Sequence, residues 1–177
     1  MRLSTRARYA LRMMLDIAKY QKETVPVSLA DVAKRTKISR GYLEQLVIAL
    51  KSGRLLRGVR GKNGGYLLQK RPEETSLRAI IEAAIGPISI LDCLESPGSC
   101  LRTDYCECRL VYVMINRRIV DVLEEFSLAD LKNPSWMAAM RRNLSLGEQP
   151  DPSSTVAFCN LCGCNKLRAW REGLSLH

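Results

Sequence analysis

Residues 28–68 carry the pattern that most restricts the fold of this chain, because two short amphipathic segments are followed directly by a glycine-rich hairpin. Ser28 stands three residues before Asp31, a spacing typical of a helix N-cap with its capping box. Ser39 precedes a second apolar segment, and Gly53 is placed to end that helix. Its predicted inner face consists of Leu43, Leu46, Val47 and Leu50. A short helix, a tight turn and a longer helix form a helix-turn-helix pattern.

The segment after Gly53 predicts a β-hairpin. Two short apolar runs, 55–59 and 66–68, flank the basic tip RGKNGG. Placed directly after a helix-turn-helix, such a hairpin forms the wing of a winged-helix domain. Its glycines let the backbone and Arg60 approach phosphate groups closely. A nucleotide-binding loop is not favoured, because the Walker pattern G-x-x-x-x-G-K-[ST] is missing from the sequence.

Four further helices are predicted before residue 134, and the last of them is a short helix that Ser127 and Asp130 open and that stops before Pro134. Apolar residues from Leu3 to Ala18 recur at helical spacing, and Thr75 or Ser76 caps a helix that ends at Gly86. The third helix carries an apolar stripe of Tyr112, Ile115, Ile119, Val122, Leu123 and Phe126. Since so small a chain offers this long helix little to pack on, we expect it to pair with its counterpart in a two-fold homodimer. Packing back onto the same chain is the alternative.

The predicted fold is therefore mostly α with a small β wing, a winged helix-turn-helix domain followed by a long dimerisation helix. Residues 1–72 are predicted to form the winged helix-turn-helix domain, and residues 73–132 are predicted to form a cysteine-containing loop and the dimerisation helix. Residues 133–177 are predicted to be a linker and a cysteine-containing tail, since they are rich in Pro, Ser and Gly before the last cysteines.

The net charge of +10 is concentrated in the first 72 residues. That part contains 17 Lys and Arg against four Asp and Glu, a charge of +13, so the remaining 105 residues carry −3. A basic first domain joined to a mildly acidic second part is typical of a nucleic-acid binder with a separate assembly or sensing region. A merely solvated basic surface is the alternative.

Four cysteines are crowded into one polar stretch, spaced C-x6-C-x5-C-x-C: Cys93, Cys100, Cys106 and Cys108. The residues between them are loop formers, so the thiols are free to surround a common group. Iron-sulfur clusters are held by thiolates from such irregular segments, whereas zinc is more often bound by paired C-x2-C motifs. The spacing favours an iron-sulfur cluster, 2Fe-2S or 4Fe-4S, over zinc, a disulfide or unrelated surface cysteines.

The expected compartment is the cytoplasm. No window approaches the roughly 18 unbroken apolar residues of a membrane span. Arg6, Arg8 and Arg12 interrupt the N-terminus where a signal peptide needs an apolar region. Cytoplasmic thiols are kept reduced, so seven cysteines argue for metal binding or redox chemistry ahead of a disulfide framework.

Several motifs in order resemble the bacterial iron-sulfur transcription regulators of the IscR and NsrR type, the Rrf-two family. They are MRLSTRARYALRMMLDIA, SRGYLEQL, VRGKNGGYLL and the cysteine loop that follows, within about residues 1–132. The resemblance implies a winged-helix homodimer that binds palindromic double-stranded DNA. It also implies a loop-bound cluster that controls DNA affinity, and therefore a regulator and not an enzyme.

Three cluster ligands carry over from the resemblance: Cys93, Cys100 and Cys106. Members of the IscR type place a histidine three residues after the last of these cysteines, where this chain has Arg109. The acidic ligand that the NsrR type places in its first helix is also missing, since the matching residue is Arg8. The candidates for a fourth ligand are Cys108, Glu107, a C-terminal cysteine or a small molecule. Cys108 is favoured because thiolate is the best iron ligand among them.

The N-terminal half of the second helix of a helix-turn-helix faces the base edges. The residues that this places at DNA are Ser39, Arg40, Tyr42 and Glu44. Arg40 can bind phosphate or guanine, and Glu44 can accept a hydrogen bond from cytosine N4. In the wing, Arg60 suits a narrow minor groove and Lys62 a backbone phosphate. Two alternatives stay open: Glu44 pairs with a neighbouring arginine, and Tyr42 is a hydrophobic support.

Three more cysteines, Cys159, Cys162 and Cys164, lie near the C-terminus and outside the family pattern. They form a possible second thiol site that binds another metal, lends a ligand to the cluster or undergoes redox chemistry; an inert tail is the alternative. Two other functions remain open for the whole chain. One is a winged-helix regulator in which a zinc ion in the loop is structural and senses no signal, and the other is a thiol redox protein.

Overall fold

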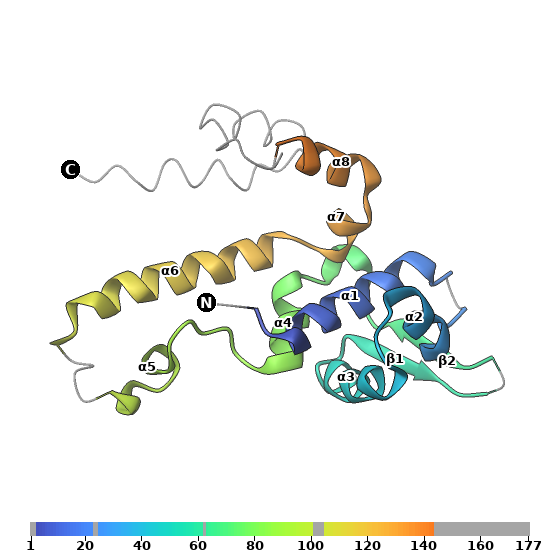
Figure 1. The fold of residues 1–177 in the computed structure, drawn as a ribbon, viewed down its shortest axis with the longest axis horizontal. Helices are drawn as coiled ribbons and strands as arrows, with labels where there is room; N and C mark the ends of the chain where they lie inside the picture. The colour runs from blue at the N-terminus through green and yellow to red at the C-terminus, as the bar shows by residue number, and fades with distance from the viewer. Residues whose placement is uncertain (1–2, 23–24, 62, 101–104, 144–177) are drawn as a thin grey trace. The chain divides into compact units, whose positions relative to one another are not determined.

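In the computed structural model of the protein, residues 3–22, 25–61, 63–100 and 105–143 are described (Figure 1). The chain divides into two compact units, residues 1–129 and residues 130–177. The described part is mostly helical, with one antiparallel sheet of two strands. The predicted fold class, a helical chain with a small β wing, is confirmed.

Three helices form the helix-turn-helix region: α1 (Thr5–Tyr20), α2 (Leu29–Thr36) and α3 (Arg40–Ser52). Each is preceded by a serine whose hydroxyl accepts a backbone N–H of the first turn, namely Ser4, Ser28 and Ser39. The Ser28 hydroxyl also donates to Asp31 Oδ2 at 2.7 Å, so the predicted pair is in contact through the hydroxyl, whereas a capping box uses the backbone N–H of the N-cap residue. Lys37 ends α2 in the left-handed region with φ of 59°, and this makes the turn tight enough for α3 to start at once.

The core lies between α1, α2, α3 and the wing. Its largest fully buried side chains on α1 and α3 are Met13, Met14, Ile17, Leu43, Leu46 and Leu50. The predicted inner face of α3 is confirmed, because all four of its apolar residues are buried. Burial of each such side chain contributes about 1.5–3 kcal/mol relative to exposure, so this core fixes the orientation of α3.

An ion pair joins α1 to α2 at the edge of this core. Arg35 donates to both carboxylate oxygens of Asp16, with its Nε at 3.0 and 3.1 Å and its Nη2 at 2.8 Å. Asp16 is buried, and its hydrogen bonds raise the pKa of Arg35 above the ordinary value. The Arg35 guanidinium also lies over the Tyr20 ring, 4.0 Å from its centroid.

The wing consists of β1 (Leu56–Val59) and β2 (Gly65–Leu68), paired from Leu56 with Leu68 to Val59 with Gly65. Val27, just before α2, extends this sheet by exchanging two backbone hydrogen bonds of 2.9 Å with Tyr66. A side chain at Gly65 would collide with the Val27 backbone. The wing is therefore anchored to the N-terminus of α2 through a close backbone approach that only glycine permits.

A fourth helix, α4 (Leu77–Ile85), packs against α1 and α3. It follows the short 3-10 helix η1 (Pro72–Glu74), begins at the Ser76 cap and ends at Gly86, whose φ is 87°. At Gly53, the end of α3, an added Cβ would lie 2.8 Å from Ala83 Cβ of α4. The close contact between these two helices therefore depends on the absence of a side chain at Gly53.

Replacing Gly53 by alanine is expected to lower the free energy of unfolding by about 1–3 kcal/mol, the usual effect of overpacking. The control is Gly41→Ala, because nothing lies within 4 Å of an added Cβ there. That change should leave stability equal or raise it by up to about 1 kcal/mol, since alanine favours helix over glycine. Urea unfolding followed by circular dichroism measures both. Equal stability of the two variants would contradict the contact.

The predicted cysteine loop contains two helical turns, α5 (Asp92–Glu95) and the 3-10 helix η2 (Pro97–Ser99). Neither was predicted, because segments this short show no apolar periodicity. The long helix α6 (Glu107–Glu125) begins earlier than the apolar stripe indicated. It extends from α5 towards α4 and contacts both helices (Figure 1).

The side chain of Asn116 joins α6 to the chain leading into α5. Its Nδ2 donates to Ile88 O at 3.1 Å, and its Oδ1 accepts from Ile90 N at 3.0 Å. At the other end of α6, Leu77 N donates to Phe126 O at 2.9 Å. The helix is thus attached both to the cysteine segment and to α4.

Two helices follow α6: α7 (Leu128–Lys132) and α8 (Pro134–Asn143). The sequence placed the start of a linker at residue 133, whereas the structure has a helix there. Asn133 Oδ1 accepts backbone hydrogen bonds from Ser135 and Trp136, and proline is well tolerated in the first turn of a helix. None of the helices in the described segments is long and apolar enough to cross a membrane.

Candidate nucleic-acid interface and cysteine loop

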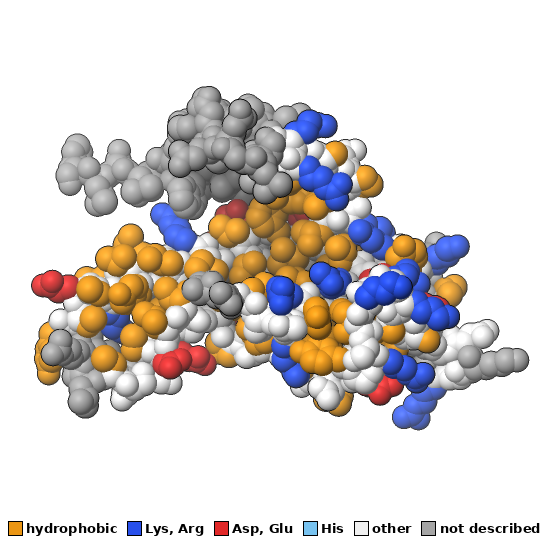
Figure 2. Space-filling model, in the orientation of Figure 1, with side chains coloured by type: hydrophobic (Ala, Val, Ile, Leu, Met, Phe, Trp, Pro, Cys, Tyr) orange, Lys and Arg blue, Asp and Glu red, His pale blue; other side chains and the backbone are white. Residues whose placement is uncertain are grey.

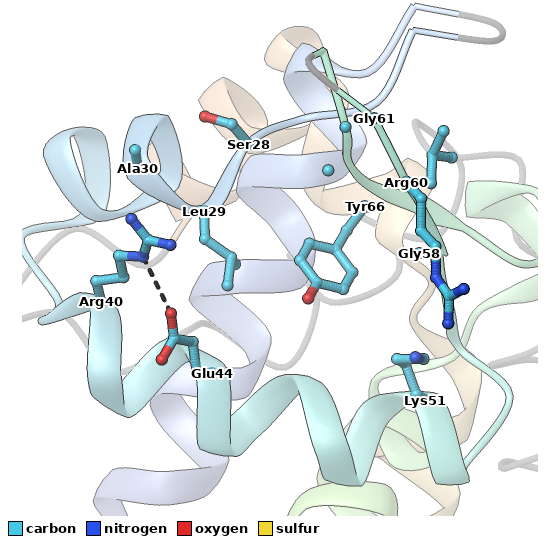
Figure 3. A pocket seen from close by; sticks show the side chains of 13 residues that line it. Ser28, Leu29, Ala30, Arg40, Glu44, Lys51, Gly58, Arg60, Gly61 and Tyr66 are labelled. Carbon is cyan, nitrogen blue, oxygen red and sulfur yellow. Dashed lines mark hydrogen bonds and ion pairs between the residues drawn. The ribbon is translucent and has the colours of Figure 1, made fainter.

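A groove of about 610 Å³ lies between α3 and the wing, closed at one end by the start of α2 (Figure 3). The lining residues are Ser28, Leu29, Ala30, Arg40, Glu44, Lys51, Gly58, Val59, Arg60, Gly61, Gly64, Gly65 and Tyr66. Three of them are cations, and glycines line most of the wing side. A cationic groove bordered by a bare backbone suits a close approach of nucleic-acid phosphates.

Arg40 and Glu44 face one another across one turn of α3. Arg40 Nε donates to Glu44 Oε1 at 3.0 Å, and the two side chains are 68% and 54% exposed. An exposed pair of this spacing contributes about 0.3–0.5 kcal/mol, so it opens at little cost when another partner approaches. Of the two alternatives for Glu44, the geometry therefore favours pairing with the neighbouring arginine in the protein without DNA.

The other described residues predicted to contact DNA differ in their neighbours. The Ser39 hydroxyl accepts from Tyr42 N at 3.4 Å as the cap of α3. The Tyr42 ring packs edge-on against Tyr9, with centroids 5.5 Å apart and planes at 85°, which matches the alternative of a hydrophobic support. Arg60 is exposed beside the groove, and Lys62 lies outside the described residues. Their contacts with DNA stay predictions.

Lys51 was not predicted from the sequence, yet it lines the same groove. It lies seven residues beyond Glu44 on α3, close to two full turns, so both project from one face of the helix. The helical spacing of Arg40, Glu44 and Lys51 was the available signal. Tyr66 was also missed, because its place in the groove depends on its pairing with Val27.

The four cysteines of the loop lie on neighbouring elements. Cys93 is in α5 and Cys100 follows η2, while Cys106 caps α6 and Cys108 lies in its first turn. Cys93 and Cys106 are half-buried, and the other two are exposed. In the segments that the structure describes, no three Cys, His, Asp or Glu side chains are placed to hold one metal ion. The thiol donor set nevertheless fits an iron-sulfur cluster or zinc by its chemistry.

The position expected for a histidine ligand holds Arg109, in the first turn of α6. Its backbone N–H donates to Cys106 O at 3.0 Å. An arginine cannot serve as a fourth ligand, because the guanidinium has donors and no acceptor. Cys159, Cys162 and Cys164 lie outside the described residues, so the second thiol site stays a prediction.

Large apolar side chains are exposed along α6, and Figure 2 shows them gathered over this helix. The most exposed are Leu110 at 71% and Met114 at 65%. The others are Val111, Tyr112, Val113, Ile115 and Val122. None of the residues of α6 is buried. Exposed apolar surfaces of this kind are typical of sites of protein association.

Residues 3–134 match the family model Rrf2, described as an iron-dependent transcriptional regulator. The chain belongs to the Rrf2 family. It is 38% identical to the HTH-type transcriptional regulator IscR of Erwinia tasmaniensis over 133 residues, which are 75% of this chain and 79% of that protein. The IscR of Serratia proteamaculans is equally similar, at 38% identity over 75% of this chain and 80% of its own length.

Solved structures of Rrf2-type regulators have the same fold. CymR, the global cysteine regulator of B. subtilis, is 34% identical with a TM-score of 0.61, covering 75% of this chain and 96% of its own. The IscR of T. potens is 28% identical with a TM-score of 0.62, covering 83% and 94%. The predicted family is confirmed, and the chain is a helix-turn-helix transcription regulator. None of these relatives carries the name of an enzyme.

Proposed function

We propose that this Rrf2 regulator binds DNA with an affinity controlled by an iron-sulfur cluster in the cysteine loop. One observation supports the proposal: Cys93 lies in α5, Cys100 directly follows η2 and Cys106 directly precedes α6, so three thiols come from successive short elements, and α5 contacts α6. The family description as iron-dependent supports the choice of iron over zinc. The bound cluster would supply iron that reacts with oxygen, nitric oxide or electrons.

Cys108 is the preferred fourth ligand, because thiolate binds iron better than the neighbouring Glu107 carboxylate. Cys108 comes two residues after Cys106, which is more than half a turn of an α-helix, so the two side chains project in different directions. Coordination of one iron by both would therefore require a local change at the start of α6. An open fourth position, a C-terminal cysteine or a small molecule remains the alternative proposal.

The groove beside α3 is proposed to receive double-stranded DNA, with α3 in the major groove and the wing at the adjacent minor groove. Arg40 and Glu44 would exchange their mutual ion pair for contacts with bases or phosphates, since that pair is exposed. Two copies joined through the apolar face of α6 would present two α3 helices to a palindromic operator. Such a DNA-bound regulator acts in the cytoplasm.

The proposed control runs through contacts within the chain. Asn116 holds residues 88–90 against α6, so a change in the cysteine loop acts on that helix. Ser76 Oγ donates to Glu124 Oε2 at 3.0 Å, which ties the other end of α6 to the start of α4. Since α4 lies against the end of α3 at Gly53, a shift of α6 would change the position of the recognition helix.

Visible absorbance of anaerobically purified protein tests the proposal. We expect a coloured protein that contains iron and acid-labile sulfide, with both largely lost in Cys93→Ala and Cys106→Ala because each removes a thiolate ligand. Mössbauer spectra of Cys108→Ala and Cys164→Ala would give the cluster type and the fourth ligand. A colourless protein with stoichiometric zinc would contradict the proposal and favour a regulator with a structural zinc site.

A further inference from the structure

Arg109 is less exposed to solvent than its neighbours at the start of α6. From Glu107 to Ile115 it is the one residue that is half-buried, and all others in that range are exposed. Its Nε is inaccessible to solvent and has no hydrogen-bond partner in the described part of the chain. Buried donors of charged groups are rarely left unsatisfied, so this N–H indicates an acceptor that belongs beside it.

The position of Arg109 on α6 shows which side of the helix it covers. Asn116 lies seven residues further on, about 20° short of two full turns, so both residues occupy one face. Asn116 contacts the backbone of Ile88 and Ile90, which lead directly into α5 and Cys93. Arg109 therefore lies on the face of α6 that is turned toward the segment carrying the first cysteine.

The cysteine loop offers an anion as the missing acceptor. The described ion pairs engage Arg35, Arg40, Arg71 and Arg78. Arg109 is in none of these pairs, yet it comes three residues after Cys106 and one after Cys108. A cluster with thiolate ligands is negatively charged, and its sulfurs accept hydrogen bonds. A guanidinium supplies several N–H donors and a permanent positive charge, so it complements such a group without coordinating it.

We propose that Arg109 donates a hydrogen bond to a sulfur of the cluster or of its thiolate ligands and raises the reduction potential of the cluster. This inference rests on the proposed function, since it requires a cluster in the loop. One-electron reduction by an external reductant adds one negative charge to the cluster. The guanidinium stabilises the reduced form more than the oxidised form, so its loss must lower the potential.

An anaerobic redox titration of the full-length protein, followed by visible absorbance, measures this effect. Arg109→Gln is expected to lower the equilibrium constant for reduction of the cluster about tenfold, which is a fall of 59 mV in the potential of a one-electron couple. Arg109→Lys keeps the charge and should retain most of the potential. Arg117→Gln is the matched control, because Arg117 is an exposed arginine of α6 and its charge stays in solvent. That variant should titrate like the unchanged protein.

The possible outcomes separate this inference from the proposed function. A lower potential in Arg109→Gln alone supports it, and so does loss of the cluster in Arg109→Gln with retention in Arg109→Lys. Equal potentials in Arg109→Gln and the unchanged protein, with equal iron and sulfide, would overturn the inference while the proposed function stands. Loss of the cluster in both Arg109 variants would also overturn it, because charge would then not be the property required. If the protein without any substitution contains no iron and no sulfide, both the inference and the proposed function are overturned.

Discussion

Met114→Glu is expected to convert the proposed dimer to a monomer and to lower its affinity for a palindromic operator at least about 100-fold. Met114 is 65% exposed within the apolar surface of α6. A carboxylate there would be buried without a partner in the proposed interface, at a cost that the lost apolar contacts increase. The affinity falls because a monomer engages one half-site, and linkage of two binding sites contributes about 10²–10⁴ in affinity.

Analytical ultracentrifugation and operator binding measured on the same preparation test this prediction. Ile48→Glu is the matched control for oligomeric state, because Ile48 is 72% exposed but lies on α3. It should remain a dimer. A dimeric Met114→Glu protein would show that α6 packs elsewhere, and a monomer with unchanged operator affinity would show that dimerisation does not contribute to binding.

The helices of the DNA-binding domain could be predicted because their signals are local. Ser28 and Ser39 cap α2 and α3 as predicted, and Gly53 ends α3. Each of these signals depends on a side chain and backbone groups within a few residues. The start of α8 at Pro134 was missed because proline was taken as a stop, although it fits the first turn of a helix equally well.

The candidate sites were predictable as sets of residues but not as arrangements. Arg40 and Arg60 were expected at DNA, yet the groove between them forms only because the backbone of Val27 pairs with Tyr66 and holds the wing beside α3. The four thiols of the loop were also grouped from their spacing alone, and their role as ligands stays a prediction. That α5 lies beside α6 depends partly on Asn116, and a single asparagine in a helix has no sequence signature for such a contact.

The electrostatics of the groove explain why one wing residue should matter more than its neighbours. The carboxylate of Glu44 offsets the charge of Arg40 in the protein without DNA, since the two are paired at 3.0 Å. Lys51 and Arg60 are the other cations that line the groove, and Arg60 is the one on the wing among them. An arginine at the wing is therefore free to interact with phosphates or with a narrow minor groove.

Arg60→Ala is accordingly expected to weaken operator binding about 10–100-fold. It should also make the slope of log K against log salt concentration shallower by about one, because one phosphate contact is lost. The loss should be greatest when the flanking sequence is A·T-rich, because a narrow minor groove attracts arginine most strongly. Arg57→Ala is the matched control: Arg57 is exposed on β1 but does not line the groove. Fluorescence anisotropy over a range of salt concentrations measures both. Equal losses in the two variants would mean that operator affinity depends only on the total charge of the domain, and that Arg60 makes no specific contact with the DNA.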